Sequence, residues 1–275
     1  MNLAKADTHP AWCGGCGNFG ILKAFNQAVE QAGIDTRTLV LVSGIGQAAK
    51  FPHYPAKPAN VFNGLHGRAL PAATGIKLAN HSLRVIVTSG DGDMYGEGGN
   101  HFVQAVRRNI SVACFVHNNQ VYGLTKGQAS PTSEVGFQTK LQVHGVIAGA
   151  FNPLAIAIIE DASFVARSFS GDVEHLTQMM IEAMKVEGFA LLDILQPCVS
   201  FNRVNTFKWY KDRVRRIDDG HDPADRAAAL ELAFKWGGEI PIGVLYRGRR
   251  RSFESQLGVL GQGALVDQCA RAQAE

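Results

Sequence analysis

The sequence predicts a doubly wound α/β fold, in which helices cover both faces of a mostly parallel sheet. Short, nearly continuous apolar runs recur along the chain, and stretches with helical periodicity lie between them. Apolar runs without polar alternation are typical of strands that are buried on both faces. Alternation of such strands with helices is typical of doubly wound domains.

The elements follow in order. The helix predicted after residue 171 starts at Asp172 and ends at Gly188, because aspartate favours the N-terminus of a helix and glycine its end. After residue 216 the pattern weakens to one helix at 223–235 and one extended stretch at 240–246. The predicted strands are 39–42, 84–88, 110–116, 154–159 and 190–195, and the other predicted helices are 68–78 and 100–108.

Composition narrows the class of protein. With 275 residues, 46% hydrophobic and 19% charged, the chain is neither disordered nor fibrous. We expect a main domain over 1–200 and a C-terminal extension over 201–275 that packs on this domain or on a partner. The net charge of +3 is too small to indicate a nucleic-acid partner by itself, and we expect none. The longest apolar run, 146–159, is shorter than a membrane span, and residues 1–7 carry no apolar signal core, so we expect a cytoplasmic protein with no membrane partner.

Polar, glycine-rich segments follow four of the predicted strands. Loops after parallel strands share one edge of the sheet, and ligands bind there. We therefore expect these segments to form one site. They are 43–47, 89–93, 117–123 and 196–198.

Two of these segments predict a metal site. Gly-Asp-Gly at 90–92 and Asn-Asn at 118–119 are separated by one helix and one strand. Asp91, Asn119 and the carbonyl of Val121 offer oxygen ligands, which suit Mg²⁺ bound to a diphosphate. Either dipeptide alone is more simply a turn, but their spacing favours the metal site.

These two segments resemble the thiamine diphosphate-binding signature, and the similarity extends further. Four more segments, together with the signature, resemble the β subunit of 2-oxoacid:ferredoxin oxidoreductases from about residue 9 to at least residue 216. These four segments are 12–17, 63–71, 122–128 and 164–172.

The resemblance implies the thiamine diphosphate-binding fold and oxidative decarboxylation of a 2-oxoacid. In that reaction the acyl group passes to coenzyme A, and an iron–sulfur cluster passes electrons to ferredoxin. A separate α subunit supplies a glutamate to the cofactor, so the chain is expected to be active only with that subunit. Pyruvate, 2-oxoglutarate and branched 2-oxoacids all stay open as substrates. The implied ligands of Mg²⁺ are Asp91, Asn119 and Val121, and the implied cofactor contacts are Ile45, Gly46, Gln47, Ala48, His66, Gly92, Asp93, Gly123 and Leu124.

Two further side chains are candidates for catalysis. His66 enters the helix at 68–78 and is expected to face the cofactor, although a structural histidine is an equal alternative from sequence. Lys126 follows the metal ligands and is a candidate partner of the substrate carboxylate, with a solvated loop lysine as its alternative.

The five cysteines do not form a disulfide pattern. Cys13-x-x-Cys16 follows no predicted strand, which argues against a thioredoxin-like role. In the family, these two cysteines, Cys198 and a cysteine in the 43–47 loop hold a 4Fe–4S cluster. Here Gln47 occupies that loop position. A cluster with a non-cysteine ligand, a 3Fe–4S cluster, a labile cluster and no cluster all stay open, and without one the chain would be a non-oxidative decarboxylase.

Basic residues gather in two places towards the C-terminus. Basic residues among Trp209 and Tyr210 would also suit a non-catalytic nucleic-acid-binding module. A solvated or subunit-facing surface is the simpler interpretation. Docking of an acidic ferredoxin is the sharper hypothesis, because complementary charge steers transient electron-transfer encounters. The metal site favours an enzyme over a binding module. The two groups are Arg203, Lys208, Lys211, Arg213, Arg215 and Arg216, and then Arg247, Arg249, Arg250 and Arg251.

Overall fold

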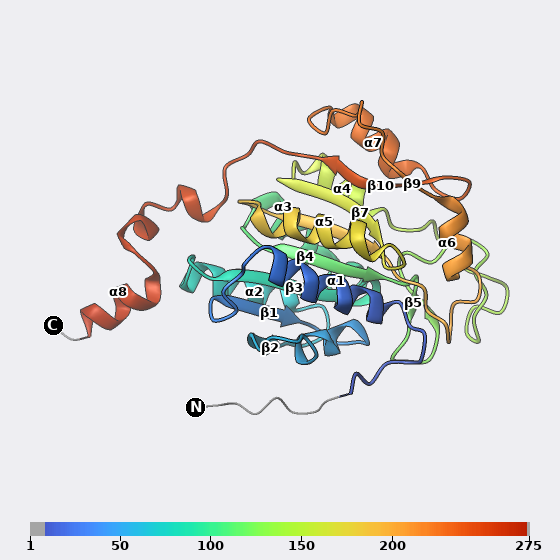
Figure 1. Cartoon of the computed structure of the whole chain (residues 1–275), viewed down its shortest axis with the longest axis horizontal. Coiled ribbons are helices and arrows are strands. Elements are labelled where there is room, and N and C mark those ends of the chain that lie inside the picture. The colour runs from blue at the N-terminus through green and yellow to red at the C-terminus, as the bar shows by residue number, and fades with distance from the viewer. Residues whose placement is uncertain (1–8, 274–275) are drawn as a thin grey trace.

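The computed structural model describes residues 9–273, so the expectation for residues 1–7 lies outside the described residues. One eight-stranded sheet forms the centre of the molecule (Figure 1). Its strands are β1 Leu39–Ser43, β2 Asn60–Asn63, β3 Arg84–Gly90, β4 Ala113–Asn118, β7 Phe164–Phe169, β8 Ala190–Leu195, β9 Val214–Arg216 and β10 Ile240–Tyr246. Their order is β2-β1-β3-β4-β8-β7-β10-β9.

The sheet is mostly parallel, as predicted. The six strands from β2 to β7 in this order run parallel, β10 pairs antiparallel with β7, and β9 is parallel to β10. Gly90 at the end of β3 pairs with His117, and Asn118 at the end of β4 pairs with Leu195. The carboxyl ends of β3, β4 and β8 therefore lie side by side.

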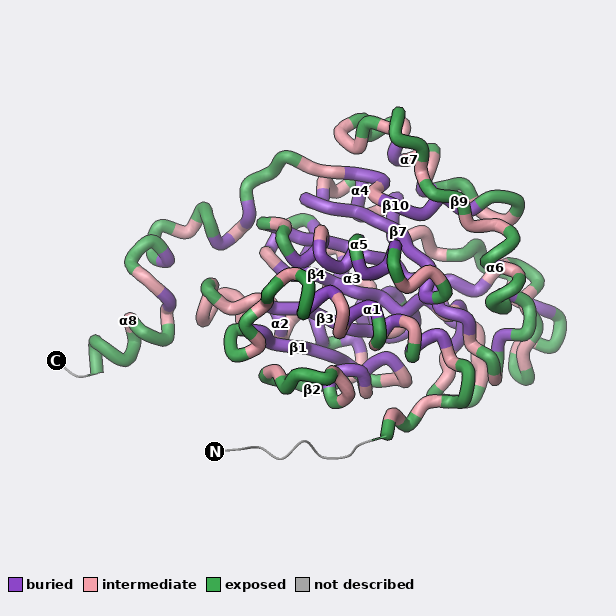
Figure 2. The backbone as a smooth tube through the Cα atoms, in the orientation of Figure 1, coloured by how far each residue is buried: buried purple, intermediate pink, exposed green. Residues whose placement is uncertain are grey.

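Helices cover both faces of the sheet and bury one apolar cluster on each. Phe25 and Met180 belong to the cluster under α1 Asn18–Gln31 and α5 Val173–Lys185. Phe102 and Ile158 belong to the cluster on the opposite face. The strands β1, β3, β4, β7, β8 and β10 are almost entirely buried, whereas the edge strands β2 and β9 are largely exposed (Figure 2). The helices of the second face are α2 Ala69–Ala79, α3 Gly99–Arg108, α4 Pro153–Ile159 and α7 Arg226–Phe234.

The strand predicted at 154–159 is wrong, because this segment is α4. Asn152 caps the helix through its side-chain oxygen, which accepts a hydrogen bond from the amide of Ala155 at 3.0 Å. Pro153 occupies the first turn, where its missing N–H leaves no helical hydrogen bond unmade. The strand that enters the sheet instead is β7, whose polar residues Arg167 and Ser168 are both buried.

The other predicted elements match the structure with shifted ends. β4 starts at Ala113 and extends to Asn118, so His117 and Asn118 belong to the strand and not to the loop after it. Shorter elements complete the chain between the strands. They are the 3₁₀ helix η1 Ala48–His53, the π-helix η2 Gly92–Glu97, the two-stranded sheet of β5 Val121–Tyr122 and β6 Gln128–Ala129, and α6 Phe207–Arg213.

The segment after residue 200 contributes to the main sheet and then leaves it. β9 and β10 extend the sheet, and α7 packs against β10 and α4. Beyond β10 the chain runs through η3 Glu254–Gln256 and η4 Gly258–Gln262 to α8 Leu265–Ala272, which projects to one side of the molecule and contacts α2 (Figure 1). Between residues 9 and 273, every helix is too short or too polar to cross a lipid bilayer.

Candidate active site

A cavity of about 110 Å³ opens at the carboxyl edge of the sheet, between the loops that follow β1, β3 and β4. All twelve residues predicted from sequence to contact the diphosphate or its metal line this cavity. They are Ile45, Gly46, Gln47, Ala48, His66, Asp91, Gly92, Asp93, Asn119, Val121, Gly123 and Leu124.

Asp91 provides a buried carboxylate at the floor of this cavity. Its side chain is 1% exposed, and burial raises its pKa to about 6. Its Oδ2 accepts hydrogen bonds from the hydroxyls of Ser130 at 2.5 Å and Thr132 at 2.6 Å. Among the described residues, no Lys, Arg or His side chain forms an ion pair with Asp91. A buried carboxylate without a cationic partner fits a divalent cation as its counter-charge.

Asn119 lies beside Asp91. Its backbone amide is 3.4 Å from Asp91 Oδ1, and its own side-chain oxygen accepts a hydrogen bond from the amide of Val121 at 3.0 Å. Val121 is buried in the short strand β5. The geometry therefore brings the three predicted metal ligands together, with oxygen atoms as the available donors.

Asp93 joins the loops that surround the cavity. Its Oδ1 accepts hydrogen bonds from the amides of Gly67 at 2.7 Å and Ile45 at 3.1 Å, and its Oδ2 accepts one from Ser89 Oγ at 2.5 Å. A Cβ atom at Gly44 would lie 2.2 Å from Asp93 Oδ2, so only glycine permits this close approach. Asp93 thus fixes the shape of the site through the backbone.

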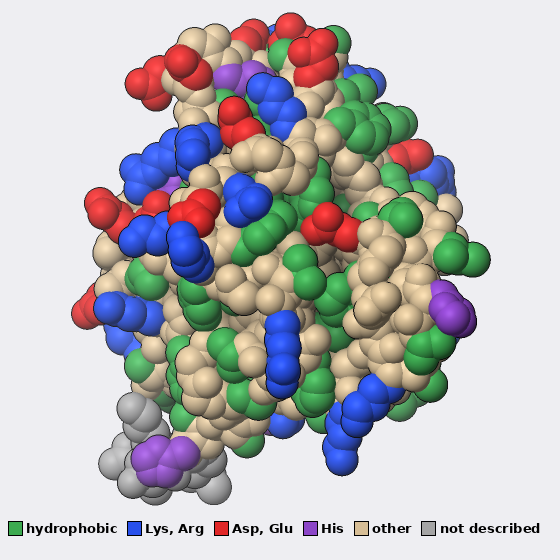
Figure 3. Space-filling view, turned by 90° about the vertical axis from the view of Figure 1, so that its right-hand side faces the viewer, with side chains coloured by type: hydrophobic (Ala, Val, Ile, Leu, Met, Phe, Trp, Pro, Cys, Tyr) green, Lys and Arg blue, Asp and Glu red, His purple; other side chains and the backbone are tan. Residues whose placement is uncertain are grey.

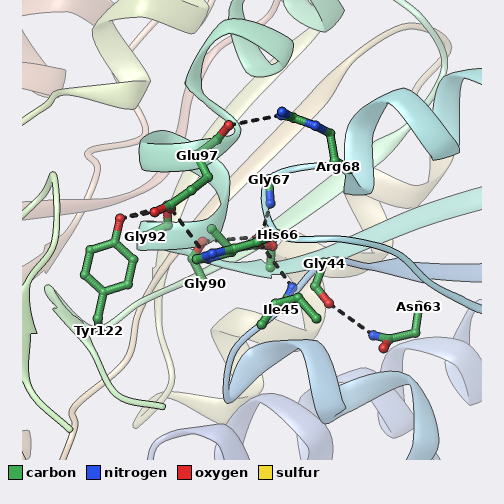
Figure 4. Close-up of polar contacts among 12 residues, drawn as sticks. Gly44, Ile45, Asn63, His66, Gly67, Arg68, Gly90, Gly92, Glu97 and Tyr122 are labelled. Carbon is green, nitrogen blue, oxygen red and sulfur yellow. Dashed lines mark hydrogen bonds and ion pairs between the residues drawn. The ribbon is translucent and has the colours of Figure 1, made fainter. Parts of the chain in front are cut away.

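His66 faces the cavity between two carboxylates. Its Nε2 lies 3.5 Å from both Asp93 Oδ1 and Glu97 Oε2. The hydroxyl of Tyr122 donates to the same Glu97 oxygen at 3.0 Å, so Glu97 lies between the two rings (Figure 4). His66 keeps a side chain that is 38% exposed, and it is therefore placed to contact a bound molecule.

Lys126 lies apart from these residues. It is exposed, adopts the left-handed conformation at φ 73°, and does not line the cavity, whereas Leu124 and Thr125 do. Its role towards a substrate carboxylate stays a prediction.

A second cavity, of about 30 Å³, adjoins the first. Cys13, Cys16 and Cys198 line it together with Gln47. Gln47, Asn119 and Gly123 line both cavities and form the wall between them. The geometry therefore brings together the three cysteines predicted to bind iron.

Gln47 is held by hydrogen bonds through both its side chain and its backbone. The side-chain oxygen of Gln47 accepts a hydrogen bond from Lys50 Nζ at 2.9 Å, and its backbone carbonyl accepts one from Trp12 Nε1 at 2.8 Å. Burial, with the nearby sulfurs of Cys198 and Cys13, raises the pKa of Cys16 to about 11. The donor set fits a cluster held through three thiolates rather than four.

The remaining cysteines lie elsewhere. Cys114 is buried in β4, and Cys269 is exposed on α8. Within residues 9–273, no group of three or more His, Cys, Asp or Glu side chains is placed to hold a single metal ion. Mg²⁺ at Asp91 would instead depend on amide, carbonyl and water oxygens.

The surface around the two cavities is partly apolar. Hydrophobic side chains lie among Lys and Arg on the face that includes this edge of the sheet (Figure 3). Tyr210 is buried and Trp209 packs against Trp236, so these aromatic rings belong to the core. Exposed apolar side chains from loops at this edge include Ile45, Leu124, Val199, Phe201 and Val204.

Comparison with known proteins places this geometry in a family. Residues 44–194 match the family described as thiamine pyrophosphate enzyme, C-terminal TPP binding domain, and residues 198–262 match the C-terminal family of the pyruvate ferredoxin oxidoreductase beta subunit. The chain is 47% identical to the 2-oxoacid:ferredoxin oxidoreductase subunit beta of Saccharolobus solfataricus, over 86% of this chain and 81% of that protein. The chain belongs to the 2-oxoacid:ferredoxin oxidoreductase β subunits.

Other members of this β-subunit family agree. The chain is 42% identical to subunit beta of 2-oxoacid:ferredoxin oxidoreductase 2 from Aeropyrum pernix, over 92% of this chain and 85% of that protein. It also resembles a solved 2-oxoglutarate:ferredoxin oxidoreductase from Magnetococcus marinus with 2-oxoglutarate, coenzyme A and succinyl-CoA bound. That likeness has a TM-score of 0.90 and 33% identity, and covers 98% of this chain and 94% of the other.

Sequence reasoning missed four residues of this β-subunit site. Ser130 and Thr132 contact Asp91, and Glu97 and Tyr122 contact each other beside His66. Ser and Thr are common in any loop, so their residue types gave no signal. The only available signal was that residues 130–132 follow shortly after the 122–128 segment.

Proposed function

We propose that this β subunit works with an α subunit to decarboxylate a 2-oxoacid oxidatively, transfer the acyl group to coenzyme A and pass two electrons to ferredoxin. The observation that carries the proposal is the buried Asp91 beside Asn119, without a cationic partner among the described residues, in a chain of this family. The solved relative from Magnetococcus marinus, with 2-oxoglutarate and coenzyme A bound, supports the reaction class.

Thiamine diphosphate, when bound, supplies the carbanion chemistry that attacks the 2-oxoacid. Asp91, Asn119 and the carbonyl of Val121 would bind Mg²⁺ at the diphosphate. His66, held between Asp93 and Glu97, would contact the cofactor or substrate and move or hold a proton. Asp93 keeps the loops of residues 45 and 67 in place for this contact.

We further propose that Cys13, Cys16 and Cys198 hold an iron–sulfur cluster through three thiolates. Their position around one cavity supports this site. The carboxamide of Gln47 is already hydrogen-bonded to Lys50, and a neutral amide oxygen is a weak ligand for iron in a sulfur-rich cluster. The cavity adjoins the cofactor cavity through a shared wall, which suits electron exit from the cofactor.

The exposed apolar and basic side chains of this chain suggest where the α subunit and ferredoxin would bind. The exposed apolar side chains near the cavity mouth would be covered by the α subunit, because apolar patches beside a site commonly mark an interface. Ferredoxin would dock on basic residues such as Lys211 and Arg203, which are exposed. Arg213, by contrast, stacks on Trp209 at 4.4 Å, and Lys208 pairs with Asp212, so these two are partly engaged within the chain.

The test uses the co-expressed αβ complex, with pyruvate and 2-oxoglutarate assayed separately. We expect reduction of ferredoxin that depends on both coenzyme A and a 2-oxoacid. Asp91→Asn should abolish it, because the amide lacks the charge that binds Mg²⁺, and the exposed Asp218→Asn should not. Release of an aldehyde without ferredoxin reduction would instead identify a non-oxidative decarboxylase.

A further inference from the structure

We propose that Ser130 and Thr132 are positioning residues for the magnesium site, and that they hold one oxygen of Asp91 so that the other is left for the metal. This inference rests on the proposed Mg²⁺ site and deepens it. It assigns a role to a segment, 130–133, that follows β6 and contributes no ligand of its own.

The two oxygens of Asp91 have different surroundings. Oδ2 accepts hydrogen bonds from Ser130 Oγ at 2.5 Å and from Thr132 Oγ1 at 2.6 Å. Thr132 Oγ1 is also 3.0 Å from Asn118 Oδ1, but a hydroxyl carries one hydrogen and the shorter contact is to the carboxylate. Among the described residues, the hydrogen-bond partner of Oδ1 from elsewhere in the chain is the amide of Asn119, at the longer distance of 3.4 Å. The oxygen that faces Asn119 is therefore the one available to a cation.

The segment that carries the hydroxyls is itself fixed. The amide of Ser130 donates to Ser133 Oγ at 2.9 Å, and Ser133 Oγ donates to the carbonyl of Gln120 at 2.6 Å. Gln120 Nε2 donates a hydrogen bond to the carbonyl of Thr132 at 2.9 Å. All four residues are at most 6% exposed. This closed set of contacts leaves the hydroxyls little freedom to turn away from Asp91.

Hydroxyl groups suit this task better than a charged side chain. A lysine or arginine at 130 or 132 would neutralise Asp91 and compete with Mg²⁺, whereas a hydroxyl orients the carboxylate and leaves its charge for the metal. Partners that orient a metal ligand typically contribute about 10- to 100-fold in metal affinity. We expect an effect of that size when one hydroxyl is removed.

The experiment measures metal binding directly. The αβ complex is stripped of metal and saturated with thiamine diphosphate, and Mn²⁺, which accepts the same oxygen ligands, is titrated while free Mn²⁺ is followed by electron paramagnetic resonance. Thr132→Val keeps the shape of the side chain and removes the hydroxyl, so its Kd for Mn²⁺ should rise by about 10-fold or more. Thr132→Ser restores the hydroxyl and should bind Mn²⁺ as the wild type does.

A matched control separates this role from general stability. Thr88 is fully buried in β3, and its hydroxyl has no hydrogen-bond partner among the described residues, so Thr88→Val makes the same chemical change without touching Asp91. It should leave the Kd unchanged. Ser130→Ala removes the other hydroxyl and serves as the second test if Thr132→Val does not fold.

Two outcomes would overturn the inference, and they are distinct. Wild-type affinity in both Thr132→Val and Ser130→Ala would refute the positioning role while leaving the metal site intact. Equal Mn²⁺ binding by the wild type and Asp91→Asn would refute the proposed metal site, and the inference with it.

Discussion

At the proposed metal site, the carboxylate of Asp91 is held by two hydroxyls that lie 39 and 41 positions further along the chain. Asp91, Asn119 and Val121 were predicted because their residue types and spacing carry oxygen ligands to one edge of a sheet. Ser130 and Thr132 were not, because their role depends on where the 130–133 segment folds back against Asp91. The spacing of residues along the chain does not predict that this segment folds back onto Asp91.

Gln47 is the residue whose replacement tests the iron site. In Gln47→Cys, a fourth thiolate enters the cavity of Cys13, Cys16 and Cys198, so iron in anaerobically purified protein should rise above the wild-type value, towards about four atoms per chain. Iron and acid-labile sulfide analysis measures this change. Electron paramagnetic resonance should show the accompanying change of cluster type.

The exposed Cys269 gives the control for that experiment. Cys269→Ser, on α8, should leave the iron content unchanged, whereas Cys13→Ser should lower it. Near-zero iron in both the wild type and Gln47→Cys would show that the three cysteines hold no cluster.

Elements were predicted well where caps and periodicity agreed. Asp172 caps α5 as expected, because its side chain accepts a hydrogen bond from the amide of His175. The apolar run at 154–159 failed because a short buried helix and a buried strand share the same pattern. The Asn152-Pro153 pair before this run is typical of the start of a helix, and it indicates the secondary structure of 154–159 better than the apolar run does. β7 was missed as a strand because Arg167 and Ser168 interrupt its apolar run.

The first turn of α5 predicts a dependence of stability on pH. Burial lowers the pKa of His175 below its usual value, with Asp172 opposing this shift and Arg216 adding to it. Below about pH 6.5 the unfolded chain therefore binds a proton that the folded chain does not, and the free energy of unfolding should fall as the pH is lowered. One such proton contributes at most about 1.4 kcal/mol per pH unit.

Urea unfolding followed by circular dichroism, from about pH 5 to about pH 7.5, measures this slope. His175→Gln keeps a polar partner for Ser168 but cannot titrate, so its slope should be smaller than that of the wild type. The exposed His53→Gln is the matched control and should keep the wild-type slope. Equal slopes in all three proteins would show that His175 does not contribute.

At the scale of the whole molecule, the fold class was predictable because most strands and helices bury an apolar face in one of two layers. The antiparallel entry of β10 beside β7 was not, since strand direction depends on the path of the chain after residue 200. The cofactor cavity lies on the face where Ile45, Leu124 and Phe201 are exposed. In the proposed αβ complex, this chain would form one side of the site.

This geometry predicts that the β chain alone does not turn over substrate. We expect no ferredoxin reduction by the purified chain, and activity that appears on addition of the α subunit and saturates near a one-to-one ratio. Sedimentation velocity on the same mixtures would report whether the two subunits associate. Steady turnover by the β chain alone would contradict this prediction.

The path of the chain beyond β10 has a practical consequence. It leaves the sheet at the edge opposite the cofactor and cysteine cavities, and α8 lies away from both (Figure 1). A tag or an electrode linker fused after α8 would leave the carboxyl edge pointing outward. Immobilised in this way, the enzyme would present its proposed electron exit to carriers in solution, whereas attachment through the segment before Cys13 would turn that exit towards the support.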